Sequence, residues 1–75
     1  MTVYSPATPR IRVNGQEEPL RAQSVAALLA QKEISTDMRG IAVAINGRVI
    51  PRADWPGTQL SAGDAIEIVL ARQGG

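Results

Sequence analysis

The stretch IAVAINGRVIP, residues 41–51, predicts a β-hairpin and decides the fold of the chain. Isoleucine and valine alternate with alanine over 41–45, which is typical of a strand with one buried face. Asn46-Gly47 follows, and this dipeptide is the strongest short signal for a two-residue turn, because a type I′ turn needs positive φ at both central positions. A short return strand comes after the turn and stops at Pro51.

An earlier stretch, RIRVNGQEEPL at residues 10–20, has the same organisation. Its first strand alternates Ile11 and Val13 with polar residues, and an Asn-Gly turn follows. The second strand contains Pro19, which lacks the backbone N–H that a central strand would donate. This strand is therefore expected at an edge of the sheet.

The segment between the two hairpins contains the single predicted helix, SVAALLAQKE at residues 24–33. Ser24 is suited to the N-cap position, because its hydroxyl accepts a hydrogen bond from a backbone N–H of the first turn. Val25, Leu28 and Leu29 are spaced i, i+3, i+4, so they share one face of the helix, which we expect to be buried.

The remainder of the chain is expected to form an irregular bridge and a last strand. The bridge covers residues 51–60, PRADWPGTQL, and its only large anchor is Trp55. The strand covers residues 65–70, AIEIVL, with Ile66, Ile68 and Leu70 facing inward.

These elements place the domain in the α+β class. The expected architecture is a mixed five-strand sheet with one helix packed across one face. The order of elements resembles the β-grasp, or ubiquitin-like, topology, in which the last strand lies beside the first in parallel. We expect a flexible N-terminal leader over residues 1–9, the β-grasp domain over 10–71, and a flexible Gly-Gly tail over 72–75.

The composition of the 75 residues excludes several classes of function. The chain has no Cys and no His, so it has no thiolate nucleophile, no imidazole base and no soft metal ligand, and no metal site is expected. Eight basic and seven acidic residues give a net charge of +1, which argues against a nucleic-acid binder. No apolar run approaches the ~18 residues of a membrane span, so a cytoplasmic location without membrane contact is the default expectation.

The acidic side chains do not indicate a catalytic pair, which requires two carboxylates in one cleft with separated pKa values. Glu17 and Glu18 are neighbours in a strand and point to opposite faces, and Asp64 follows a glycine in a predicted turn. We therefore predict no catalytic side chain. The arginines of the two hairpins are interpreted as a solvated surface in preference to a site for phosphate or an acidic partner: Arg10, Arg12, Arg48 and Arg52.

Covalent chemistry is instead suggested by the last residues, ARQGG, where Gly75 carries an α-carboxylate. Residues 71–75 reach roughly 16–18 Å when extended, at about 3.3–3.6 Å per residue. Gly74 has no Cβ, so the backbone can enter a channel too narrow for a side chain. A rigid domain with a thin tail is suited to present a carboxylate to the active site of another protein. The alternative interpretation is a frayed end without function.

Two stretches, AVAINGRVIPRADW and LSAGDAIEIVLARQGG, together resemble the ThiS family, the sulfur carrier proteins of thiamine biosynthesis. The resemblance covers about residues 11–75 and rests on these features: Asn46-Gly47, Val49-Ile50-Pro51-Arg52, Trp55, Gly63-Asp64 and Gly74-Gly75. It implies a β-grasp carrier protein that is acted on by partner enzymes and is not itself an enzyme.

The resemblance also implies a reaction sequence at the C-terminus. An adenylating enzyme of the ThiF type uses ATP-Mg to convert the carboxylate of Gly75 into an acyl adenylate. A persulfide sulfur then displaces AMP, which leaves a thiocarboxylate, and a thiazole synthase of the ThiG type takes that sulfur into the thiazole ring. The carrier itself is expected to bind no cofactor.

Partner docking is expected on the sheet face opposite the helix. The alternation places Ala42, Ala44 and Val69 there, as a flat apolar patch. Scattered surface apolar residues without a role are an equal alternative. Arg72 either contacts an acidic groove on the adenylating partner or keeps the tail solvated, and we favour solvation.

Two further functions stay open at this point. A small subunit of molybdopterin synthase would use the same chemistry at Gly75 with a different docking surface, and the INGRVIPRADW hairpin favours thiamine over this alternative. A ubiquitin-like modifier that forms amide bonds to lysine, or a passive interaction domain, belongs to another class of function.

Overall fold

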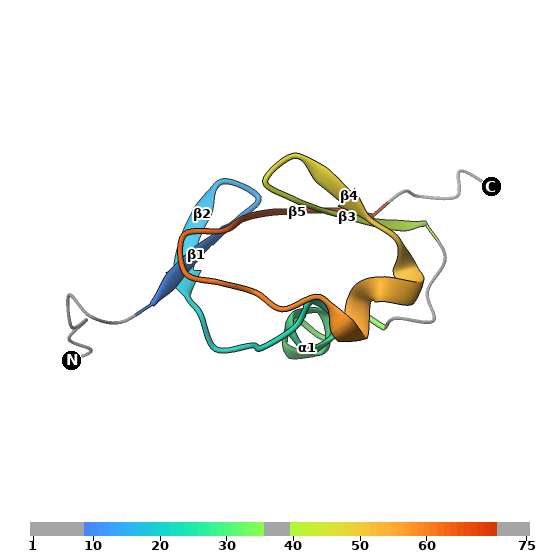
Figure 1. Ribbon diagram of the computed structural model, residues 1–75, viewed down its shortest axis with the longest axis horizontal. Helices are drawn as coiled ribbons and strands as arrows, with labels where there is room; N and C mark the ends of the chain where they lie inside the picture. The colour runs from blue at the N-terminus through green and yellow to red at the C-terminus, as the bar shows by residue number, and fades with distance from the viewer. Residues whose placement is uncertain (1–8, 36–39, 71–75) are drawn as a thin grey trace.

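The computed structural model of the chain describes residues 9–35 and 40–70. Figure 1 shows one sheet with a helix and a 3₁₀ helix on one side of it. The sheet has five strands in the order β2-β1-β5-β3-β4. The elements along the chain are β1 (Arg10–Val13), β2 (Gln16–Pro19), α1 (Val25–Gln31), β3 (Ile41–Ile45), β4 (Arg48–Ile50), η1 (Arg52–Gly57) and β5 (Ala65–Leu70). The predicted α+β fold, a mixed five-strand sheet with one helix across one face, is confirmed.

Both hairpins turn at the predicted Asn-Gly dipeptides. Asn14 and Gly15 have φ of 51° and 85°, and Asn46 and Gly47 have φ of 52° and 85°, as a type I′ turn requires. β1 and β2 pair in antiparallel register, as do β3 and β4. β2, which contains Pro19, lies at an edge of the sheet, as predicted from the missing backbone donor.

β5 lies in the centre of the sheet, between the two hairpins. It runs parallel to β1, with Arg12 opposite Ala65, and antiparallel to β3, with Ile41 opposite Leu70. The last strand of the described domain is therefore inserted beside the first, as the β-grasp topology requires. This arrangement makes β5 the strand that connects the two halves of the sheet.

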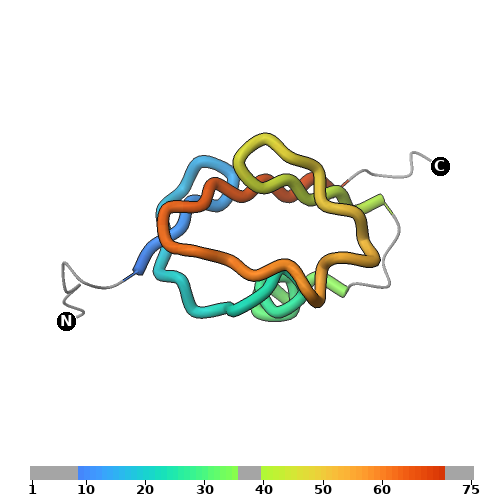
Figure 2. Tube along the Cα trace, in the orientation of Figure 1, coloured from blue at the N-terminus to red at the C-terminus, as the bar shows by residue number. Residues whose placement is uncertain are grey.

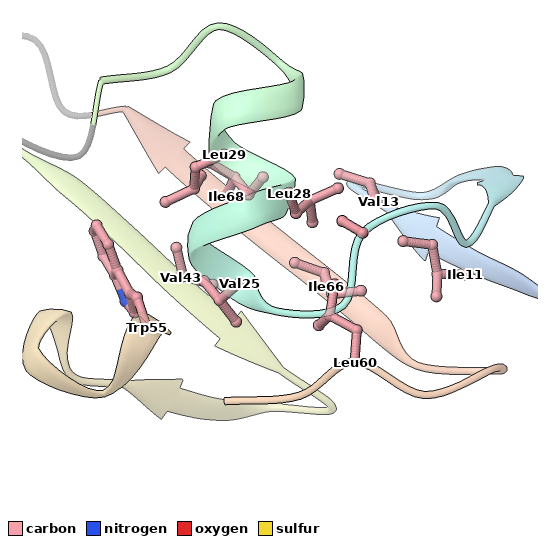
Figure 3. Packing of buried hydrophobic residues seen from close by; sticks show 11 residues of the cluster. Ile11, Val13, Val25, Leu28, Leu29, Val43, Trp55, Leu60, Ile66 and Ile68 are labelled. Atoms are coloured by element: carbon pink, nitrogen blue, oxygen red, sulfur yellow. The ribbon is translucent and has the colours of Figure 1, made fainter. Parts of the chain in front are cut away.

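The helix α1 packs the expected face against the sheet. Val25, Leu28 and Leu29 are buried, and Figure 3 shows them directed toward Val43, Ile66 and Ile68 of the sheet. The full buried cluster consists of Ile11, Val13, Ala22, Val25, Leu28, Leu29, Val43, Trp55, Leu60, Ile66 and Ile68. The core is aliphatic apart from the single tryptophan.

Ser24 occupies the N-cap of α1, where its Oγ accepts a hydrogen bond from the backbone N–H of Ala27 at 3.1 Å. Because α1 has only seven residues, it depends on this cap more than a long helix would. Ser24→Ala is therefore expected to lower the free energy of unfolding by about 1 kcal/mol, measured by urea denaturation. Ser24→Asp, which keeps an acceptor, should stay close to the wild type, and equal losses in the two variants would contradict the cap.

The segment after β4 is more regular than expected. Residues Arg52–Gly57 form the 3₁₀ helix η1, so the prediction of an irregular bridge is wrong for this part. The indole of Trp55 is 2% exposed, and its Nε1–H donates to the carbonyl of Ile50 at 2.9 Å. The Arg52 guanidinium lies 4.9 Å from the ring centroid. Burial of one large side chain thus fixes the conformation of a stretch that contains Pro56 and Gly57.

The chain beyond η1 returns beside the start of α1, as the tube in Figure 2 shows. The N–H of Val25 donates to the carbonyl of Thr58, and the N–H of Leu60 donates to the carbonyl of Gln23, both at 3.0 Å. Leu60 joins the buried cluster at this point. Trp55 is therefore not the only large anchor between β4 and β5.

Leu70 was predicted to face inward into the core, but it is not buried. It lies opposite Ile41 on the side of the sheet that carries α1, yet it is 52% exposed. α1 has seven residues and is about 10 Å long, whereas the six residues of β5 span about 20 Å. The helix therefore covers the middle of β5, and the strand continues beyond the core.

Candidate functional site

β5 leads directly to the residues for which covalent chemistry is predicted. The strand ends at Leu70. Arg72, Gly74 and Gly75 lie outside the described residues, as do residues 1–8 of the expected leader. The described part of the candidate site is therefore β5, its neighbours in the sheet, and the sheet face turned away from α1.

The side chains of the two turn asparagines hydrogen-bond to β5 from opposite sides. Asn14 accepts from the N–H of Ile68 through Oδ1 at 2.8 Å and donates to the carbonyl of Ile68 through Nδ2 at 3.2 Å. Asn46 accepts from the N–H of Ala65 through Oδ1 at 3.0 Å. The sequence predicted these asparagines only as turn residues. Local spacing carries no signal for the contact of Asn14 with Ile68, because the two residues are 54 positions apart.

The sheet face turned away from α1 carries the three residues predicted for docking. Ala42 and Val69 lie opposite each other on β3 and β5, and Ala44 is the next residue of β3 on this face. Val49 on β4 lies opposite Ala44 and is 71% exposed, while Val69 is 56% exposed. We call the surface formed by Ala42, Ala44, Val49 and Val69 the open face. Val49 was not predicted for this face, although the two-residue turn fixes its pairing with Ala44.

Charged side chains border the open face. Glu67 of β5 lies opposite Ala44 and is exposed. On β1 and β2, Glu17 contacts two arginines, with its Oε1 3.2 Å from Nε of Arg10 and its Oε2 3.9 Å from Nη2 of Arg12. These side chains are 42–59% exposed, so each ion pair contributes little to stability. Arg10 and Arg12 thus contact Glu17, whereas Arg52 lies over the ring of Trp55. These three arginines do not contact one common group.

Two of the described carboxylates connect turns or elements of the fold. Asp64 accepts from the N–H of Ser61 through Oδ2 at 2.8 Å and from Nδ2 of Asn46 through Oδ1 at 3.1 Å. Glu18 of β2 pairs with Lys32 at the end of α1, with Oε1 2.8 Å from Nζ. Residues 9–35 and 40–70 contain no buried polar side chain and no group of three potential metal ligands. We find no enclosed catalytic site in this part of the chain.

Comparison with known protein families assigns the chain to one of them. A profile of the ThiS family matches residues 7–75. The chain belongs to the ThiS family. The matched range includes the residues on which the resemblance rests, from the Asn46-Gly47 turn to Gly74-Gly75.

Two relatives agree with this assignment. The sulfur carrier protein ThiS of Thermus thermophilus is 30% identical over 63 residues, which cover 84% of this chain and 95% of that protein. A crystal structure of the thiamine biosynthesis protein ThiS from Geobacter metallireducens matches with a TM-score of 0.72 at 26% identity. That match covers 88% of this chain and 99% of the crystallised chain.

The predicted family is therefore confirmed, and with it the general class of function. ThiS proteins are small sulfur carriers rather than enzymes, and family membership implies partners that activate the carrier and accept its sulfur. Within residues 9–35 and 40–70, no helix has the length and apolar character needed to cross a membrane.

Proposed function

We propose that this ThiS family member carries sulfur for the thiazole moiety of thiamine, as a thiocarboxylate at Gly75. The observation that carries the proposal is the position of β5. This strand is paired on both sides within the sheet, and the five residues that follow it end in Gly74-Gly75. The names of the two relatives, a sulfur carrier protein and a thiamine biosynthesis protein, support the same role.

The proposed chemistry begins with activation, because a bare carboxylate is a poor electrophile. An oxygen of the Gly75 carboxylate attacks the α-phosphorus of ATP on a ThiF-type partner, which forms an acyl adenylate and releases pyrophosphate. The terminal sulfur of a protein persulfide attacks the carbonyl carbon, and AMP leaves. A thiol then cleaves the S–S bond of the acyl disulfide, which frees the thiocarboxylate. A ThiG-type thiazole synthase accepts this sulfur.

The composition of the chain supports sulfur transport on its terminus. The sequence contains no Cys, so no side chain can hold the sulfur as a persulfide, and the thioacid must be made from a carboxyl group. We propose that ATP-Mg is bound by the adenylating partner and that the carrier binds no cofactor of its own. The proposed location is the cytoplasm, where thiols stay reduced.

The open face is the proposed docking surface for these partners. It has small or β-branched apolar side chains on three neighbouring strands, and Val49 and Val69 are exposed large hydrophobic residues. An apolar centre with a charged border is the composition of many protein interfaces. Val69 of β5 belongs to the open face, so a partner bound there lies beside the end of the strand from which the tail continues.

A matched pair of alanine-to-arginine substitutions tests the docking surface. Ala42→Arg places a long charged side chain in the open face, whereas Ala30→Arg makes the same change on the exposed side of α1. Ala42→Arg is expected to weaken binding to the adenylating partner at least about tenfold in Kd, which corresponds to ~1.4 kcal/mol, measured by calorimetry. Ala30→Arg should bind as the wild type does. Equal affinities of the two variants would contradict docking on the open face.

The function itself is tested by intact mass. The carrier is co-expressed with a ThiF-type adenylating enzyme and a persulfide donor, and the expected mass gain is the replacement of one oxygen by one sulfur at the C-terminal residue. An unchanged mass with active partners would contradict the proposal. Binding to a molybdopterin synthase large subunit in preference to a thiazole synthase would assign a different acceptor, and ladders of lysine conjugates in extracts would indicate a protein modifier.

A further inference from the structure

The side-chain amide of Asn14 takes the place of a missing strand beside β5. In a parallel ladder, one residue bonds to two residues of its neighbour that are two positions apart. β1 follows this pattern at first, since the N–H of Arg12 donates to the carbonyl of Asp64 and the N–H of Asn14 donates to the carbonyl of Ile66, both at 2.9 Å. The next ladder bond would join the carbonyl of residue 14 to the N–H of Ile68.

The main chain cannot make that bond, because it turns away at Asn14. Asn14 and Gly15 adopt positive φ, and Gln16 begins β2 on the far side of β1 from β5. The side-chain amide contains the same C=O and N–H groups as a peptide unit. Its Oδ1 accepts from the N–H of Ile68 at 2.8 Å, and its Nδ2 donates to the Ile68 carbonyl at 3.2 Å. Both backbone groups of Ile68 on this side are therefore bonded by one side chain.

We propose that Asn14 is a positioning residue for delivery of Gly75, because its amide fixes the C-terminal half of β5 against the sheet. The inference rests on the proposed function of the tail. The last β1–β5 pair is Val13 with Ile66, so after this pair β5 has a strand partner, β3, on one side only. The Asn14 amide supplies the second side at Ile68, two residues before the strand ends.

The distance between this contact and the reactive group makes its effect on delivery large. Gly75 is seven positions beyond Ile68, so an extended chain spans roughly 23–25 Å between them, at about 3.3–3.6 Å per residue. When a partner holds the tail extended, the position at which β5 ends determines how far Gly75 reaches, and a rotation of β5 about its pairing with β3 shifts that position. Misplacement of a reacting group by about 1 Å costs on the order of 10²-fold in rate. Docking on the open face, in contrast, does not involve Asn14.

Asn46 provides a matched control within the same fold. It has the same Asn-Gly turn, with φ of 52°, and its Oδ1 accepts from the N–H of Ala65 at 3.0 Å. This contact lies at the first residue of β5, at the opposite end from the tail. Loss of the Asn46 side chain should therefore lower stability without changing how the tail is presented.

The test compares Asn14→Gly with Asn46→Gly, because glycine keeps the positive φ of both turns and removes both amides. The carriers are assayed by ATP–pyrophosphate exchange on a ThiF-type adenylating enzyme, with kcat and KM for the carrier determined separately. Amide hydrogen exchange at Ile68 reports the local contact. A loss of stability alone would reduce the folded fraction, which raises the apparent KM and leaves kcat unchanged, so kcat is the deciding quantity.

Asn14→Gly is expected to lower kcat about tenfold or more with KM unchanged. It should also raise the rate of amide hydrogen exchange at Ile68 about tenfold, which corresponds to ~1.4 kcal/mol. Asn46→Gly should keep the wild-type kcat. Should Asn14→Gly not fold, Asn14→Asp, which keeps the acceptor and loses the donor, is expected to lower kcat at least about threefold, which corresponds to ~0.7 kcal/mol. Equal kcat values in wild type and the Asn14 variant, or equal losses in both asparagine variants, would overturn the inference alone. A wild-type carrier that supports no exchange would overturn the proposed function and the inference with it.

Discussion

Deletion of Gly75 is expected to abolish thiocarboxylate formation and to leave the free energy of unfolding of the domain unchanged. The shortened chain would still end in a glycine carboxylate, but that group would lie about 3.3–3.6 Å short of the α-phosphorus of ATP. A displacement of this size exceeds the ~1 Å that already costs on the order of 10²-fold in rate. The measurement is intact mass after incubation with the adenylating and sulfur-transfer partners, together with urea denaturation of both proteins.

A substitution of the neighbouring polar residue is the control for this deletion. Gln73→Ala keeps the length of the tail and both glycines, so it should acquire sulfur as the wild type does. Conversion of the Gly75 deletion at the wild-type rate would show that the reaction does not require a carboxylate at position 75. A large loss of stability in the deletion would show instead that residue 75 contributes to the fold.

Trp55→Ala is expected to have the largest effect on stability, a loss of about 3–5 kcal/mol. The indole is buried at the end of the core, its N–H bonds to the Ile50 carbonyl, and the Arg52 guanidinium lies over the ring. A chain of 75 residues is expected to have a total stability of about 4–11 kcal/mol, at roughly 0.05–0.15 kcal/mol per residue. The variant should therefore be largely unfolded at moderate urea concentrations, which denaturation followed by circular dichroism will show.

Two controls separate the contributions of Trp55. Trp55→Phe keeps an aromatic ring and loses the N–H donor, so its loss should be smaller than that of Trp55→Ala. Val49→Ala removes a hydrophobic side chain that is 71% exposed and should change stability by about 0.5 kcal/mol or less. A cost for Trp55→Ala no larger than that for Val49→Ala would contradict the role of the indole in the core.

Local signals predicted the elements of the sheet well. The two Asn-Gly turns and the alternation of apolar residues act over a few positions, and both hairpins have the expected strands and turn geometry. The face of α1 that carries Leu28 and Leu29 was predictable for the same reason. The insertion of β5 beside β1 joins distant residues, and its prediction depended on resemblance to the β-grasp topology.

The predictions for Leu70 and for the segment η1 were wrong for the same physical reason. A sequence pattern indicates on which face a residue lies, but it does not indicate which other parts of the fold cover that face. Alternation correctly places Leu70 on the side of α1, and the exposure of that residue follows from the short length of the helix. The conformation of η1 likewise depends on burial of Trp55 against the core. Pro56 and Gly57 inside this segment favour irregular structure when considered locally.

The candidate site was predictable where it rests on alternation or on family motifs. Ala42, Ala44 and Val69 lie together on the open face, while their docking role stays a prediction. Asn14 was identified only as a turn residue, because its second partner, Ile68, is brought to it by the fold of the whole chain. A single side chain can thus have one role that is visible locally and another that requires the tertiary structure.

The central position of β5 also determines the order in which the domain can fold. Each hairpin can form on its own within about 1–10 μs, but the two occupy opposite sides of β5 in the sheet. Their coupling requires closure of a long loop, since contacts such as Asn14 with Ile68 span 54 positions, and such non-local pairing slows folding. A chain in which β5 has not yet inserted therefore has two unjoined hairpins, and the apolar side of each is exposed. Insertion of β5 between the hairpins is therefore the step that completes the sheet, and the same step fixes the point from which the tail leaves the domain.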